Sequence, residues 1–98
     1  MRTVHGVPVR LSDERWRHII EHHDDVAGHY QDVLETVAHP DALYEGSAGE
    51  MLAVRRYHER YLVVPYRELS KEDGFVITAF FTTRVRQIER RRLAWRRE

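Results

Sequence analysis

The chain has 98 residues, of which 42% are hydrophobic, so it can build one compact core. Its formal net charge is zero, so charge repulsion does not keep it unfolded. It contains no cysteine, which excludes disulfides and thiolate metal sites. No apolar run approaches the ~20 residues of a membrane span, and the N-terminus lacks a signal-peptide core. We therefore expect a single cytoplasmic domain, residues 1–98, without membrane contact.

The N-terminal half is predicted to be helical after a short strand over residues 3–10. Ser12 is a good N-cap, and two acidic residues follow it in the first turn, where the helix dipole favours negative charge. A second helix ends before Pro40, and the two helices form either a hairpin or one kinked helix. Their apolar positions recur at helical spacing: Trp16, Ile19, Ile20, His23 and Ala27 in the first, and Val26, Tyr30, Val33, Leu34 and Val37 in the second.

Beyond Pro40 the apolar residues recur at every second position, which predicts strands joined by short turns. Pro65 cannot donate a ladder hydrogen bond, so its strand should carry a bulge or lie at a sheet edge there. Residues 84–98 are predicted to form a last helix. We therefore expect an α+β fold, with two N-terminal helices packed on a four-stranded antiparallel sheet and a C-terminal arginine-rich helix. The predicted strands are Ala42–Glu45, Met51–Tyr57, Tyr61–Arg67 and Phe75–Thr83.

Charge is distributed unevenly along the chain. Residues 84–98 contain seven arginines against two glutamates, whereas residues 1–83 carry the compensating negative charge. Arginine binds phosphate bidentately, so this segment, with Trp95 interleaved, has the composition of a phosphate-binding surface. The same arginines could instead pair with the acidic part of the chain or with a protein partner. Under the first interpretation nucleic acid is bound by Arg84, Arg86, Arg90, Arg91 and Arg92.

A possible metal motif lies on the first helix. Residues 18–22 read His-Ile-Ile-Glu-His, which matches the inverted zinc-protease pattern with two histidines at i and i+4 and a glutamate as base. At ~100° per residue, however, His18 and His22 lie roughly opposite the apolar stripe and should face solvent. We therefore predict a solvated helix face, without a metal or any other cofactor.

His23 differs because it lies within the apolar stripe of the first helix. It is either a core histidine that is hydrogen-bonded to a backbone carbonyl, or a general base or acid at the junction of helix and sheet.

The predicted strands carry further polar candidates. In a regular last strand, Thr78 and Thr82 would share one face, and the other face would be apolar and seat the helices. Tyr66 lies on the strand before, and one of Arg55 and Arg56 must fall on each face of its own strand, although the register cannot be fixed. An arginine beside these hydroxyls could hold a phosphate, or the same residues could be ordinary sheet positions.

Three stretches resemble a known family of small, largely uncharacterised prokaryotic proteins: RLSDERWRHIIEHH (10–23), YLVVPYRE (61–68) and GFVITAFFTTR (74–84). That family is similar to the barnase/EndoU/colicin/RelE-like (BECR) group of compact, metal-independent ribonucleases, and the resemblance covers roughly residues 9–84. It implies a toxin-type or phage-type endoribonuclease that cleaves RNA by attack of the 2′-hydroxyl on the adjacent phosphate. By position it marks His18, His23, Tyr66, Thr78 and Thr82, with Arg55 or Arg56 as the basic residue.

The sequence departs from the family pattern at His22 and Asp24, where relatives tend to have arginine and proline, and at Pro65. The alternative to an enzyme is a non-catalytic domain that binds RNA, or a partner protein such as an antitoxin, through its arginine-rich segment.

Overall fold

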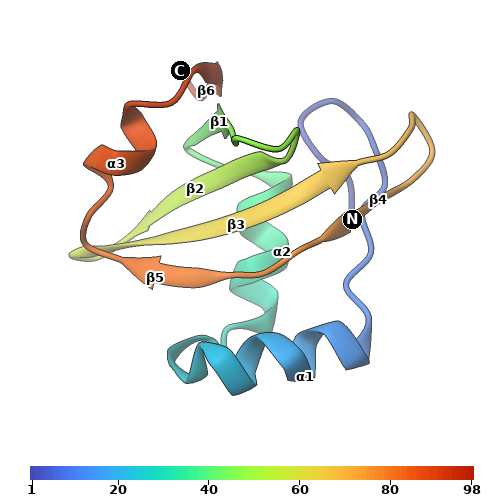
Figure 1. The fold of residues 1–98 in the computed structure, drawn as a ribbon, viewed down its shortest axis with the longest axis vertical. Helices are drawn as coiled ribbons and strands as arrows, with labels where there is room; N and C mark the ends of the chain where they lie inside the picture. Colours follow the sequence, from blue (N-terminus) through green and yellow to red (C-terminus); the bar gives the residue numbers. More distant parts are fainter.

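The computed structural model describes residues 1–98 and has an α+β fold, as predicted (Figure 1). Its helices are α1 (Asp13–His22), the short 3-10 helix η1 (Asp24–Val26), α2 (Tyr30–Ala38) and α3 (Arg86–Glu89). None of them is both long and apolar enough to cross a bilayer. The strands are β1 (Ala42–Glu45), β2 (Met51–Tyr57), β3 (Arg60–Glu68), β4 (Gly74–Val76), β5 (Phe80–Thr82) and β6 (Leu93–Arg96).

The strands form one antiparallel sheet of six strands, rather than the four that we predicted. The order is β4-β3-β2-β1-β6, and β5 pairs with β3 beside β4. The long strand β3 therefore has two neighbours on one side: β5 along residues 61–63 and β4 along residues 66–68. Residues 3–10 form only isolated bridges, Arg2 to Pro8 and Arg10 to Phe75, so the strand predicted there is wrong.

The predicted strand Phe75–Thr83 is divided by a bulge opposite Pro65. Between its two pairings β3 has two residues, whereas the facing chain has three, residues 77–79. The Pro65 carbonyl accepts the Ile77 N–H at 2.9 Å. Because the N–H and C=O of a strand residue point to the same side, the N–H that proline lacks would have pointed at this bulge. Pairing with β2 is continuous across Pro65, so the irregularity lies on the neighbouring strand.

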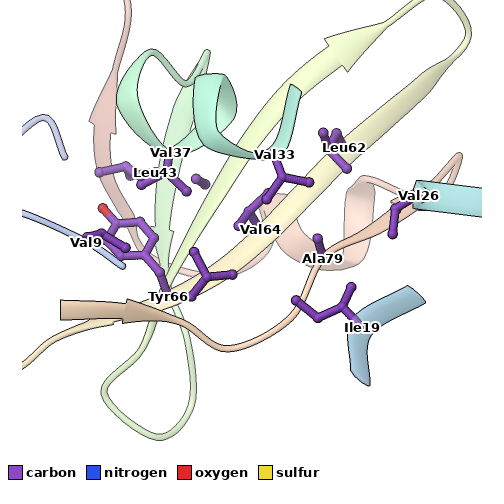
Figure 2. Close-up of a cluster of buried hydrophobic side chains, with 12 residues drawn as sticks. Val9, Ile19, Val26, Val33, Val37, Leu43, Leu62, Val64, Tyr66 and Ala79 are labelled. Atoms are coloured by element: carbon purple, nitrogen blue, oxygen red, sulfur yellow. The ribbon is translucent and has the colours of Figure 1, made fainter. Parts of the chain in front are cut away.

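The core lies between the N-terminal helices and one face of the sheet (Figure 2). Helix α2 packs against β3 and β2, and η1 packs against β5. Val33 and Val37 of α2, Val26 of η1 and Leu62 of β3 are fully buried there. The N-terminal helices therefore lie over one face of the sheet, and the C-terminal end of α1 lies close to the bulge.

The C-terminal segment is not the helix that we predicted. Only Arg86–Glu89 is helical, and Leu93–Arg96 forms β6, which pairs antiparallel with β1 at the edge of the sheet. Two ion pairs with the β1 region hold it: Arg92 Nε to Glu45 at 3.4 Å, and Arg97 Nη2 to Asp41 at 2.7 Å. On the sheet face opposite α2, Val85 and Ile88 pack against a second apolar cluster, Ala42, Tyr44, Val54 and Val63.

Candidate functional site

A shallow groove of about 280 Å³ runs between α1 and the bulge. It contains three of the side chains that the sequence singled out for the site, His18, His23 and Thr78. Arg15, Ile19, His22 and Ile77 complete its lining. No carboxylate lines the groove, so its charged and titratable side chains are one arginine and three histidines.

Helix geometry brings Arg15, His18 and His22 together, because they lie at i, i+3 and i+7. The rings of His18 and His22 are 4.4 Å apart between centroids and tilted by 45°. Nδ1 of His22 lies 2.9 Å from the carbonyl oxygen of His18, and since a carbonyl only accepts, this nitrogen must carry the proton. In the neutral ring Nε2 of His22 is then the free acceptor. A metal site would need a third histidine or a carboxylate close to His18 and His22, and the structure has no such group of three.

His23 ends α1, and its backbone N–H donates to the Ile19 carbonyl at 2.8 Å. Its side chain is half-buried, and its ring lies 5.8 Å from the Phe80 ring between centroids. No hydrogen bond within the chain engages the imidazole nitrogens of His23, so the backbone-carbonyl bond of the first interpretation is absent. Both ring nitrogens are free for a ligand in the groove.

The two threonines do not share a face, because the bulge breaks the alternation. Val76 and Ala79 both pack in the core on the α2 side, whereas Phe80 packs with the cluster on the opposite face. Thr78 lies in the bulge and lines the groove. Thr82 lies opposite Tyr61, and its hydroxyl accepts the backbone N–H of Arg84 at 2.9 Å.

Tyr66 lies in the core, as Figure 2 shows, and does not line the groove. Its side chain is fully buried, and its hydroxyl has no hydrogen-bond partner. Burial raises the pKa of the Tyr66 phenol, and the nearby negative charge of Glu68 raises it further. The phenol is therefore neutral and is not available to position a phosphate.

This buried hydroxyl leads to a stability prediction. Tyr66→Phe should leave the protein as stable as the wild type or more stable by about 1 kcal/mol, because it removes an unpaired buried polar group. The matched control is Tyr57→Phe, since the Tyr57 hydroxyl donates to Asp32 at 3.3 Å and its loss should cost about 0.5–1.5 kcal/mol. Urea denaturation measures both, and a clear loss of stability in Tyr66→Phe would contradict the assignment.

The two arginines of β2 point away from the groove. Arg55 donates to the carbonyl of His39 at 3.2 Å and lies 3.8 Å from the carboxylate of Glu35, at the C-terminal end of α2. Arg56 is exposed and donates from Nε to the carbonyl of His58 at 2.9 Å. Neither lines the groove, and Arg15 is the cation that does.

Sequence reasoning missed two features of this part of the molecule. Arg15 could have been found from its position one turn before His18. The second feature is a polar cluster at the start of α2, where Nδ1 of His29 lies 2.8 Å from Asp32 Oδ2 and Tyr57 donates to the other oxygen of that carboxylate. The signal for the pair is the i, i+3 spacing of His29 and Asp32, but Tyr57 joins them only through the fold.

The C-terminal arginines fall into two groups. Arg84, Arg86 and Arg90 line a second groove together with Tyr61. Arg91 lines neither of the two grooves, and Arg92 is the ion-pair partner of Glu45.

Comparison with known proteins found no match: no family model, no curated protein and no solved structure is significantly similar to the chain.

Proposed function

We propose that the groove between α1 and the bulge is the active site of a metal-independent endoribonuclease. The observation that carries this proposal is the convergence of His18, His22, His23, Arg15 and Thr78 on one hollow without a carboxylate. Such a lining suits an anionic ligand with protons to exchange, and an RNA phosphodiester beside its 2′-hydroxyl is that ligand. The resemblance to BECR-type ribonucleases supports the same reaction class.

The reaction is an internal transesterification. A neutral imidazole, which we assign to His23, takes the proton of the 2′-hydroxyl while the 2′-oxygen forms a bond to phosphorus. The bond from phosphorus to the 5′-oxygen breaks, and a protonated imidazole of the His18–His22 pair gives its proton to that oxygen. The products are a 2′,3′-cyclic phosphate and a 5′-hydroxyl, so atoms and protons balance without water or metal.

The remaining groups act on charge and position. Arg15 can donate two parallel hydrogen bonds to the non-bridging phosphate oxygens, on which negative charge grows in the transition state. The hydroxyl of Thr78 can donate a further bond from the opposite wall. Because the groove uses two forms of imidazole at once, kcat/KM should show a bell-shaped dependence on pH.

The test is cleavage of an unstructured, fluorescently labelled RNA in the presence of EDTA. We expect cleavage to continue in the chelator, with fragments that end in a 2′,3′-cyclic phosphate and begin with a 5′-hydroxyl. Mass spectrometry of the fragments identifies both ends. Cleavage that requires an added divalent ion, or fragments with 5′-phosphates, would contradict the mechanism.

A further inference from the structure

We propose that Arg84, Arg86 and Arg90, with Tyr61, form a binding site for single-stranded RNA that continues along β5 to the groove beside α1. This inference rests on the proposed function, because it names the form of the substrate and its path across the protein. Its test below uses RNA that cannot be cleaved, so the two can fail separately.

The second groove has a volume of about 460 Å³ and lies where the chain leaves β5 and enters α3. Besides Tyr61 and the three arginines, Thr83, Val85 and Gln87 line it, and no carboxylate does. The groove therefore has three positive charges and one aromatic ring in its lining. The whole chain has a net charge of zero, so this local excess of positive charge is a distinct feature of the groove.

Ion pairing separates these arginines from others in the same segment. Arg92 and Arg97 are paired with Glu45 and Asp41 and hold β6 against β1. Arg84, Arg86 and Arg90 form no ion pair within the chain. Their guanidinium groups therefore remain available to a ligand. Guanidinium groups bind phosphate oxygens bidentately, which makes a phosphate chain the ligand that fits.

The aromatic ring points to a single strand rather than a duplex. Tyr61 lies on β3 and lines the groove beside the arginines. Exposed bases of a single strand stack on aromatic side chains in a positively charged groove, whereas the bases of a duplex are already stacked on each other. The 2′-hydroxyl attack proposed for the first groove also needs a strand that can bend at the cleaved phosphate.

The strand β5 (Phe80–Thr82) runs from the bulge at the first groove to the loop that lines the second. His23 contacts Phe80, and Phe80 packs with Tyr61 in the cluster on the face opposite α2. From Thr78 in the first groove to Thr83 in the second, the chain spans at most ~18 Å. Figure 1 shows β5 passing α1 and leading into the loop before α3. A short single strand can therefore reach both sites.

The test measures binding of a 2′-O-methyl RNA, which lacks the attacking hydroxyl, as a function of salt. Changing Arg84, Arg86 and Arg90 together to glutamine should make the log–log salt slope shallower by about 2, because each lost phosphate contact removes roughly 0.7. The matched control changes Arg2, Arg17 and Lys71 to glutamine, which removes the same charge from residues that line neither groove. Equal effects of the two triple variants would overturn the site in favour of non-specific charge attraction.

A second variant separates stacking from charge. Tyr61→Leu keeps apolar packing but removes the ring, so affinity should fall by roughly 5- to 150-fold with an unchanged salt slope. If the wild type binds this RNA as expected but cleaves no RNA, the binding site stands and the proposed cleavage fails. Two results would refute the binding site: the arginine variant binds the RNA as tightly as the wild type does, although the wild type cleaves RNA, or the oligonucleotide does not bind at all. In either case an acidic protein becomes the partner for these arginines.

Discussion

Changing His23 to glutamine is expected to slow RNA cleavage by roughly 10²–10⁴-fold, because the group that accepts the 2′-hydroxyl proton is lost. Glutamine has a similar reach and can hydrogen-bond, so the fold should be kept. The imidazole of His23 makes no hydrogen bond within the chain, and the substitution therefore leaves no buried partner unsatisfied. Single-turnover cleavage at saturating RNA measures the effect on the chemical step alone.

The control for His23→Gln is His39→Gln. His39 is exposed at the end of α2, and its side chain makes no hydrogen bond, so this variant should cleave like the wild type. Circular dichroism and the urea midpoint of each variant show whether it is folded. A folded His23→Gln variant that cleaves at the wild-type rate would remove His23 from the mechanism, and the groove would then need another base.

Local signals predicted α1, α2 and the first strands, but α1 ends at His22 rather than reaching Ala27, and Val26 lies in the separate 3-10 helix η1. The Ser12 hydroxyl accepts the Arg15 N–H at 3.1 Å, which is the cap that the sequence indicated for α1. The strands β1 and β2 begin and end at the predicted residues, because alternation and the flanking turns determine them. In these regions local preference and tertiary packing agree.

The errors of the fold prediction come from interactions between distant residues. The break at residues 77–79 depends on Pro65, which becomes their neighbour only when β3 and the last strand pair. In the same way, Leu93–Arg96 becomes a strand because β1 offers an open edge with Asp41 and Glu45 close to Arg97 and Arg92. The helix was predicted there from the apolar residues Val85, Ile88, Leu93 and Trp95 spaced among the arginines.

The structure brings together only some of the predicted site residues. Helical spacing placed His23 in the apolar stripe, strand alternation suggested Thr78, and His18 was marked by the family resemblance alone; these three line one groove. The pairing of Thr78 with Thr82 assumed a regular strand, which the bulge excludes. Tyr66 is excluded from the groove because each side chain of a strand points to one face of the sheet, and that of Tyr66 points into the core. The sequence could not decide between the two faces.

The central claim is that the groove promotes attack of a 2′-hydroxyl on RNA, and the attacking group itself can be removed from the substrate. The measurement compares single-turnover cleavage, in EDTA, of an RNA with one preferred cleavage site and of the same RNA with a single 2′-deoxyribose immediately 5′ to that phosphate. The account predicts cleavage of the first and complete loss of cleavage at the modified position of the second, with unchanged binding. Cleavage of the deoxyribose substrate at a comparable rate, or no cleavage of either substrate, would contradict it.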